Sequence, residues 1–540
     1  MSRSTWRDLI GLAAFALAVR LLVAALVGEP PWTDSAYYFA SAREIATGHG
    51  LTVPFLWSFL ETGGTLPADP GLPIPSHAHW MPLTSFVSAA SMAMFGPHWW
   101  AAQVPMVVLS TALTPMTYLI ARDLWRSRTA AIVGSVLVVF CGPLLLFGSI
   151  VENFAVFGVA GSGALVTAMR AAGGGSGARW WLVASGALVG IATLARIEGV
   201  LLSIATATSW LIGMGWSPWR FDGRRIGWVA GFGALVAFGA LVAPWLLRNL
   251  QAFGSVLPST GGSTLWIKNY NEQFSLSADT SLAAYLAQGP LPIIGSKLSA
   301  WLVVGGYVFV LLGGLFAIFF VASLALRRRD PTVAPFLMYF VLMLVIMGGL
   351  FTFHAPRGLF NHHAAAWLPI AAPMGVLGGA PVATALGRWW RFLERPATHR
   401  FLVVASLGAA ITISVTTSAL LLRSWREDVA AVHRVEAFLN ANAEPGDVVM
   451  HRDAPLLSTI SGYPVVGLPH DPFPVIEDVA LAYGADWLVA QRQTQGDRVE
   501  PTGLWEGGRA IDSEGHRADW LEETPAYEDD LVRIYAVRRE

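Results

Sequence analysis

The feature that most constrains this chain is a series of apolar stretches, each about as long as a membrane-spanning helix. About 20 apolar residues in an α-helix cross the ~30 Å hydrocarbon layer and satisfy their own backbone groups. By this length criterion we predict about eleven spans, at residues 9–28, 99–121, 129–148, 153–170, 180–195, 199–215, 227–246, 298–326, 332–353, 364–386 and 401–422. The chain is therefore expected to be an α-helical polytopic membrane protein.

The composition supports this expectation. Of the 540 residues, 54% are hydrophobic and only 13% are charged, whereas soluble proteins carry about 25% charged residues. These values exclude an ordinary soluble enzyme, a coiled coil and a disordered protein. The charges form no basic stripe, so a nucleic-acid partner is not expected. The single cysteine, Cys141, allows no internal disulfide.

The charges also predict the topology. If the short apolar segment 82–95 lies along the outer membrane surface as a juxtamembrane helix, the inner loops hold 17 basic residues, Arg220 and Arg224 among them, against five acidic ones. The outer loops then hold six basic and nine acidic residues. Cytoplasmic loops are enriched in Lys and Arg. We therefore expect a multi-pass protein of the cell (inner) membrane whose N-terminus is cytoplasmic and whose C-terminal tail is extracytoplasmic.

The tail is acidic and differs in pattern from the rest. It contains 11 Arg and 22 Asp or Glu, out of totals of 35 basic and 36 acidic residues in the chain. Short β-rich runs alternate there with helical patterns, at 447–451, 463–467, 486–490 and 531–537. This alternation predicts a small α/β domain at 423–540, after a transmembrane domain at 1–422.

Two carboxylates are candidates for chemistry at the outer face. Thr33 or Asp34 can cap a helix that begins near Ser35; alternatively, an ionised Asp34 just above the membrane can act as a general base. Glu152 stands between two spans at the outer membrane edge, where a carboxylate is costly and often functional. Its alternative role is that of a turn residue in headgroup water.

Histidines near the same face raise the question of a metal. His77 and His79 precede the juxtamembrane helix, and His354, His362 and His363 lie in a late outer loop. Three histidines and a carboxylate can bind a divalent cation, but such residues also hydrogen-bond to water or headgroups. Asp34 and Glu152 offer the oxygen ligands that Mg²⁺ or Mn²⁺ prefers, which favours them as the metal ligands. No phosphate loop or nucleotide-binding fingerprint occurs, so no nucleotide or organic cofactor is expected.

Arginines at the outer edge need an explanation, because the charge rule disfavours Arg196, Arg248 and Arg357 there. Guanidinium groups bind phosphate through a two-point fork, which suits a lipid-linked phosphate at the membrane edge. The alternatives are an ion pair of Arg196 with Glu198, whose spacing does not share one helix face, and snorkelling of Arg248.

Three further residues stay without a firm role. Arg20 lies inside the first span and receives no assignment. Trp57 and Trp80, two outer tryptophans, can anchor the chain at the interface or stack on a sugar ring.

Several stretches together carry a family resemblance. They resemble motifs of the GT-C superfamily of membrane glycosyltransferases, in the protein O-mannosyltransferase and aminoarabinose transferase branch, and most of all the bacterial lipopolysaccharide galacturonosyltransferase-like family. The likeness spans roughly residues 1–420 and rests on TDSAYYFASAREIATGHGL (33–51), SHAHWMPLTSFVSAASMAMFG (76–96), SIVENFAVFGV (149–159), LARIEG (194–199), APWLLRNLQAFGSVLP (243–258) and FHAPRGLFNHHAAAWLPIAAP (353–373). It departs from the family after His79, where the double proline is missing, and at Ile197, which replaces a proline.

The resemblance implies a hexosyl- or pentosyltransferase that moves a sugar from a polyprenyl-phosphate donor to a glycan, lipid or protein hydroxyl, with inversion. It implies Asp34 as the base, Glu152 as an orienting group, with or without a divalent cation, and Arg196, Arg248 and Arg357 around the donor phosphate. Tyr37, His77, His79 and His362 would contact the acceptor or support the site. The fold it implies is GT-C, with about 11 transmembrane helices plus juxtamembrane helices.

Two other classes stay open. A transporter or flippase of lipid-linked sugars would show polar or broken helices near the bilayer midplane, whereas the deep segments here are mostly apolar. A non-catalytic cell-envelope assembly protein would use the acidic tail to bind its partner.

Overall fold

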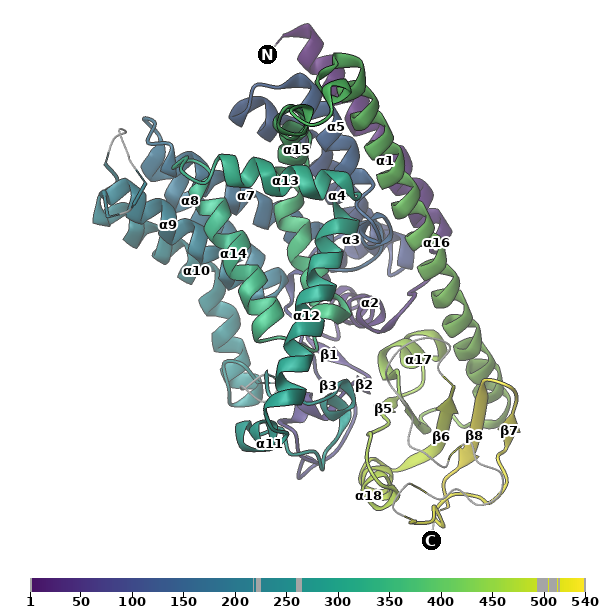
Figure 1. Ribbon diagram of the computed structural model, residues 1–540. Helices are drawn as coiled ribbons and strands as arrows, with labels where there is room; N and C mark the ends of the chain where they lie inside the picture. Colours follow the sequence, from purple (N-terminus) through teal and green to yellow (C-terminus); the bar gives the residue numbers. More distant parts are fainter. Residues whose placement is uncertain are drawn as a thin grey trace.

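The computed structural model describes residues 2–216, 218–219, 225–258, 265–492, 504, 512 and 515–538; Arg220 and Arg224 lie outside the described residues. A long helical body makes up most of the molecule, with the N-terminus at one end and a small sheet domain at the other (Figure 1). Helical structure therefore dominates, as predicted.

Nine helical segments of the described residues are long and apolar enough to cross a membrane. They are Arg3–Leu26 (α1), Trp99–Leu124 (α4), Phe154–Ala172 (α7), Ala178–Ala195 (α8), Ile197–Leu202 with Ser203–Met214 (η2 and α9), Trp228–Phe253 (α10), Pro290–Leu311 (α12), Ala355–Leu359 with Phe360–Gly387 (η5 and α15), and Pro396–Asn442 (α16). Shorter apolar helices are Leu83–Phe95 (α3), Arg128–Val139 (α5), Leu315–Leu326 (α13) and Ala334–Gly349 (α14). This arrangement confirms the polytopic helical fold, including a helix at the segment predicted to be juxtamembrane.

The remaining helices are short and lie mainly in the connections. They are Thr33–Ala46 (α2), Phe59–Thr62 (η1), Leu144–Phe147 (α6), Tyr270–Phe274 (η4), Leu282–Ala287 (α11), Arg391–Glu394 (η6), Ala454–Ser461 (α17) and Phe473–Tyr483 (α18).

Two predicted spans are broken in the structure. The span predicted at 298–326 is two helices, α12 and α13, separated by a turn in which Gly313 and Gly314 have φ of 67° and 79°. The span predicted at 129–148 is α5 followed by the single turn α6, with Gly142 at φ 57° between them. Only glycine adopts such φ values readily. Hydropathy misses both breaks, because the residues on each side are equally apolar.

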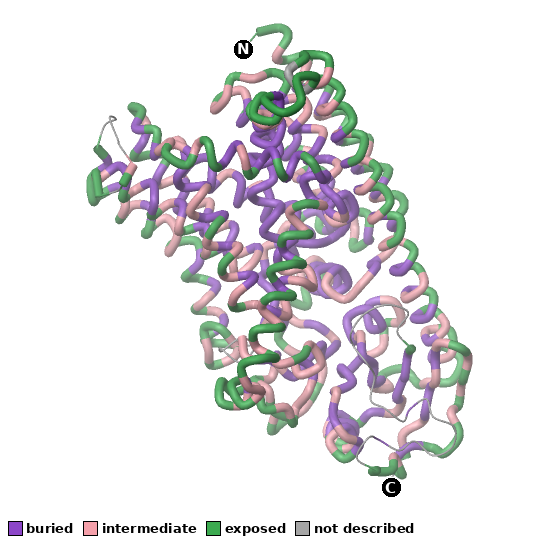
Figure 2. The backbone as a smooth tube through the Cα atoms, in the orientation of Figure 1, coloured by how far each residue is buried: buried purple, intermediate pink, exposed green. Residues whose placement is uncertain are grey.

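Small residues allow the central helices to approach closely. A Cβ on Gly161 of α7 would lie 2.5 Å from the Cβ of Ala366 in α15, and one on Gly134 of α5 would lie 2.7 Å from Pro373. Buried residues gather in the middle of the helical body and exposed residues along its outer helices (Figure 2). Because many of these exposed residues are large and apolar, the outer helices present a lipid-facing surface.

All four β-rich runs of the tail form strands. They are Val448–His451 (β4), Val465–Gly467 (β5), Ala485–Gln491 (β6) and Val532–Ala536 (β8), in a six-stranded sheet of order β2-β5-β4-β6-β8-β7. Strands β2 (Phe55–Leu56), β5, β4 and β6 run parallel to one another. Strand β8 runs antiparallel to β6, and β7 (Tyr527–Glu528) runs antiparallel to β8. A separate pair is formed by Thr52–Val53 (β1) and Ile74–Pro75 (β3).

The sheet ties the tail to the first outer loop. Edge strand β2 comes from residues 55–56, far from the tail in sequence, and pairs with β5. Helix α16 runs without interruption from Pro396 to Asn442, so the boundary placed after residue 422 falls inside a helix. The long first loop and the tail therefore share one sheet.

Candidate functional site

Asp34 lies in the first turn of α2. The helix begins at Thr33, and its N-cap is Trp32, which makes no side-chain cap hydrogen bond. Neither Thr33 nor Asp34 is therefore the cap, and the capping alternative is wrong. Instead, the Trp80 side chain hydrogen-bonds to the Asp34 carboxylate, and the Thr33 hydroxyl donates to Asp453 Oδ2 at 2.8 Å.

The environment of Asp34 tunes its proton affinity. Desolvation raises the pKa of Asp34 to about 6, while the positive charge of Arg196 and the Trp80 hydrogen bond oppose the rise and Asp453 adds to it. A pKa near 6 suits a group that accepts a proton at neutral pH.

Glu152 lies next to Asp34. Its side chain is fully buried; Oε1 accepts the Asn153 backbone N–H at 3.1 Å, and Oε2 has no hydrogen-bond partner among the described residues. Desolvation, and after it the charge of Asp34, raise the pKa of Glu152 well above its usual value. Two buried carboxyl groups whose charges act on each other do not both ionise readily, so the pair favours a proton or a cation between them.

The loop that carries Glu152 is held by three polar side chains. Arg20 donates to the carbonyls of α6 at 2.7 and 3.3 Å, Gln103 donates to a loop carbonyl at 3.2 Å, and Ser35 donates to the carbonyl of Val151 at 3.0 Å. Arg20, which the sequence left without a role, is thus a buried donor at the end of a membrane-embedded turn. Ser35 follows Asp34 and Val151 precedes Glu152, so the Ser35 hydroxyl joins the two segments that carry the acids.

Arg196 is the arginine beside the two acids. It lies in the extended link between α8 and η2, where its Nε and Nη2 approach Glu198 Oε2 and Oε1, both at 3.3 Å. The helix spacing that argued against this ion pair does not apply, because the helix ends at Ala195. Although desolvation opposes it, the charges of Glu198, Tyr38 and the two acids hold the pKa of Arg196 above its ordinary value.

A hydrogen-bonded row continues from this centre. Asn153 Nδ2 donates to the Tyr38 hydroxyl at 3.0 Å, and its Oδ1 lies 2.6 Å from His362 Nδ1. Since an amide oxygen only accepts, His362 Nδ1 carries the proton. The His362 ring also stacks on Phe154 with centroids 3.9 Å apart. Tyr38 and Asn153, each adjacent to a residue chosen from the sequence, are additional members of the site.

His77, His79 and Tyr37 support the site from the first loop. The His77 ring lies between the Ser76 and Ser85 hydroxyls at 2.8 and 3.0 Å, and its backbone N–H donates to the Tyr37 hydroxyl at 2.6 Å. Desolvation lowers the pKa of His77 to about 3 and that of His79 to about 4. Both rings are neutral at neutral pH, and His77 braces the loop.

The tryptophans pack within the protein. Trp80 stacks on Tyr37 at 3.9 Å and lies 4.3 Å from Trp57, and both indoles are buried. Their stacking on a sugar does not fit this arrangement. Beneath them, Glu61 Oε2 accepts the Trp57 backbone N–H at 3.0 Å, and desolvation raises the pKa of Glu61 to about 8. Glu61 is a buried carboxyl group that sequence patterns did not single out.

Among the described residues, the candidate histidines do not form a metal site. Within the described ranges, no group of three or more His, Cys, Asp and Glu side chains is placed to hold a metal ion. His362 engages Asn153, while His363 Nδ1 pairs with the Tyr339 hydroxyl at 3.0 Å. Asp34 and Glu152 supply two carboxylates, so a hard cation at this pair would need its other ligands from water and substrate.

The other two arginines lie in different surroundings. Arg248 lies over Trp245 and Phe253, 4.9 and 5.0 Å from the ring centroids, and its Nη2 donates to the carbonyl of Leu51 at 3.4 Å. Arg357 stacks on Tyr270 at 3.7 Å. Of the three predicted phosphate ligands, Arg196 is the one whose positive charge acts on both acids.

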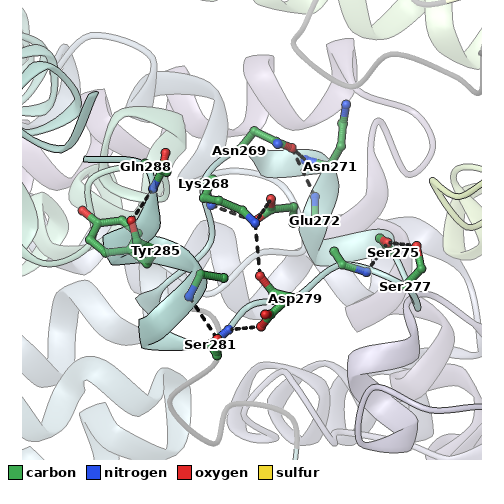
Figure 3. Close-up of polar contacts among 12 residues, drawn as sticks. Lys268, Asn269, Asn271, Glu272, Ser275, Ser277, Asp279, Ser281, Tyr285 and Gln288 are labelled. Carbon is green, nitrogen blue, oxygen red and sulfur yellow. Dashed lines mark hydrogen bonds and ion pairs between the residues drawn. The ribbon is translucent and has the colours of Figure 1, made fainter. Parts of the chain in front are cut away.

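Arg357 lines a polar cavity of about 450 Å³ at the junction of the outer loop 247–297 and the tail. Its lining residues are Asn269, Tyr270, Asn271, Glu272, Ser275, Ser277, Ala278, Phe353, Arg357 and His470. In this loop the Lys268 ammonium bridges Glu272 and the carbonyl of Asp279, both at 3.1 Å (Figure 3). From the tail, Asp471 accepts hydrogen bonds from Ser275 Oγ at 2.6 Å and from the Ser277 N–H at 3.0 Å.

A row of aromatic contacts connects this cavity to Asp34. Tyr270 packs on Phe274 at 5.4 Å, Phe274 on Trp57 at 5.4 Å, and Trp57 on Trp80, whose indole reaches Asp34. A continuous series of packed aromatic side chains thus joins the cavity to Asp34 of the acidic pair.

Comparisons with known proteins identify the fold. The family model of dolichyl-phosphate-mannose-protein mannosyltransferases matches residues 76–246. ArnT from Cupriavidus metallidurans, bound to undecaprenyl phosphate, superposes with a TM-score of 0.56 at 14% identity over 99% of this chain and 98% of its own. An Archaeoglobus fulgidus oligosaccharyltransferase in complex with Zn and sulfate gives 0.55 at 12% identity, over 89% and 68%. The chain has the GT-C fold of membrane glycosyltransferases.

One more solved structure is similar in fold. Archaeal AglB from Archaeoglobus fulgidus, in complex with an inhibitory peptide and a dolichol-phosphate, gives a TM-score of 0.50 at 13% identity, over 91% of this chain and 70% of AglB. The curated proteins contain no match. Within the GT-C fold, the family match contains Glu152 and Arg196, while Asp34, Arg248 and Arg357 lie outside it.

Proposed function

We propose that the protein transfers a sugar from a polyprenyl-phosphate donor to an acceptor hydroxyl on a glycan, lipid or protein. The observation that carries this proposal is the grouping of Asp34, Glu152 and Arg196 at the ends of α2, α7 and α8. The undecaprenyl phosphate of ArnT and the dolichol-phosphate of AglB support a lipid-phosphate donor.

Asp34 acts as the general base. With a pKa of about 6 it is mostly ionised at neutral pH, so it can take the proton from the acceptor hydroxyl as that oxygen attacks the anomeric carbon. The new carbon–oxygen bond forms while the bond from the anomeric carbon to the donor phosphate oxygen breaks. A single displacement of this kind inverts the anomeric configuration, and the lipid phosphate departs with the bonding electrons.

Arg196 stabilises the departing phosphate, on which negative charge develops. Its pairing with Glu198 fixes the plane of the guanidinium and leaves the group beside the two acids. Glu152 orients the donor phosphate or the acceptor. Where a divalent cation binds, Asp34 and Glu152 are the residues that would hold it, and it would add positive charge at the phosphate.

We assign the remaining predicted residues to the region around Asp34, Glu152 and Arg196. Arg357 contacts the part of the substrate that enters the polar cavity, and Arg248 stabilises the segment of Tyr37 and His77. His79 and His362 border the acceptor side. Because the arginine-rich loops mark the cytoplasmic face, we place the reaction on the extracytoplasmic face of the cell membrane.

Mass spectrometry of envelope glycans tests the proposal. A deletion strain should lack one glycosidic linkage that the complemented strain restores, and that linkage identifies donor sugar and acceptor together. A flippase would instead move a fluorescent lipid-linked sugar across reconstituted vesicles without transferring it, and an assembly protein would do neither. Either result would contradict the proposed transferase.

A further inference from the structure

Asp453 lies where the C-terminal domain meets α2, the helix that carries Asp34. Both carboxylate oxygens of Asp453 accept hydrogen bonds there. Oδ1 accepts the Leu456 N–H at 3.3 Å and caps α17, while Oδ2 accepts the Thr33 hydroxyl at 2.8 Å. Thr33 is the first residue of α2 and immediately precedes Asp34. One side chain thus joins the start of α17 to the start of α2.

Other contacts surround the same turn. The Thr459 hydroxyl lies 3.5 Å from the carbonyl of Ala36, and Trp32 stacks on Trp425 of α16 with 6.4 Å between centroids. Helix α17 lies beside α2 (Figure 1). The N-terminus of α2 has no side-chain cap of its own, so these contacts with the tail hold its first turn in place.

We propose that Asp453 is a positioning residue for Asp34: through Thr33, the C-terminal domain holds the first turn of α2 so that the Asp34 carboxylate faces the acceptor. This inference rests on the proposed function. It gives the tail a task in the reaction besides folding, because the base then sits correctly only when the tail is docked on α2.

A double-mutant cycle tests the Asp453–Thr33 contact. Thr33→Val and Asp453→Ala, each in the complemented deletion strain at matched membrane levels, should lower the yield of the linkage about tenfold. The double variant should be no worse than Asp453→Ala alone, because both changes remove one interaction. Thr33→Ser keeps the hydroxyl, so this variant should give the wild-type yield.

Asp447→Ala is the matched control for lost stability. Asp447 lies on the same domain and accepts the Glu444 N–H and the Trp487 indole N–H, both at 3.0 Å, so these hydrogen bonds stay within that domain. It should lower the melting temperature of the purified protein as Asp453→Ala does, but leave transfer unchanged. A loss of transfer in Asp447→Ala equal to that in Asp453→Ala would overturn the positioning role.

Hydrogen–deuterium exchange of the purified full-length protein separates this proposal from the proposed function. Amides of residues 34–38 should exchange faster in Thr33→Val and Asp453→Ala than in wild type or Asp447→Ala. Unchanged exchange, or additive losses in the double variant, would overturn the proposal while leaving the transferase intact. If the deletion strain loses no glycosidic linkage, the proposed function itself fails; if Asp34→Asn keeps full transfer, only the role of Asp34 as the base fails, whatever the exchange shows.

Discussion

Arg196 and Glu198 form a two-point ion pair, with both nitrogen–oxygen distances at 3.3 Å, although they are only two residues apart in the sequence. The pair exists because α8 ends at Ala195 and the chain is extended at Arg196 before η2 begins. Its guanidinium is therefore held in one plane next to Asp34 and Glu152. This geometry is the basis for the role of Arg196 at the departing phosphate.

Replacing Arg196 by lysine should lower the transfer rate about 100-fold, because an ammonium group cannot form the two-point contact with Glu198 and the phosphate. The rate of glycosyl transfer by purified protein in detergent measures this. Glu198→Gln, which keeps an oxygen acceptor, should lose much less. Full activity of the lysine variant would show that the fork geometry is unimportant.

Gly199 allows η2 to fold back closely on the end of α8. A Cβ at this position would lie 2.5 Å from the backbone of Ala192, so Gly199→Ala should push η2 away and displace Arg196. We expect lower transfer and a lower melting temperature. Gly408→Ala in α16, where a Cβ would meet nothing within 4 Å, is the control and should be neutral or slightly stabilising. Equal behaviour of the two variants would contradict the proposed close packing.

The pH dependence of transfer should report Asp34. Since desolvation raises its pKa to about 6, the base is protonated below that value, and the rate should fall as the pH drops through 6. Trp80→Phe removes a hydrogen bond that favours the ionised carboxylate, so it should move the acidic inflection to higher pH. An inflection that stays in place, or moves lower, would exclude this assignment.

Glu61 should make the protein less stable at alkaline pH. Burial raises its pKa from 4.5 to about 8, so the folded protein holds a proton that the unfolded chain releases between these values. The stabilisation is complete below pH 4.5 and is lost as the pH rises through 8. Glu61→Gln should remove this loss, which melting temperatures between pH 6 and pH 9 would detect. A variant with the same alkaline decline as wild type would contradict the prediction.

Hydropathy was a good guide to the helices and to the tail strands, because long apolar runs and short β-rich runs carry local signals. It failed at Gly142 and Gly313, where a single backbone conformation breaks an apolar stretch. Strand β2 could not be anticipated, since two residues carry no pattern of their own and pair only because β5 lies beside them.

The site was predictable only where its residues stand out locally in the sequence. Asp34, Glu152 and Arg196 stand out as charges at the membrane edge, and the structure brings them together. Arg248 and Arg357 stand out equally but pack on other aromatic residues. The roles of Trp80 and Asp453 arise only from tertiary contacts, which join Asp34 to residues 46 and 419 positions further along the chain.

The central claim is that Asp34 removes the proton from the acceptor. The most direct measurement is the rate of linkage formation by Asp34→Asn, an isosteric change without a base, in the complemented deletion strain at wild-type membrane levels. We predict a loss of at least about 100-fold with an unchanged melting temperature, and a smaller loss for Asp34→Glu. Transfer by Asp34→Asn at the wild-type rate would contradict the account.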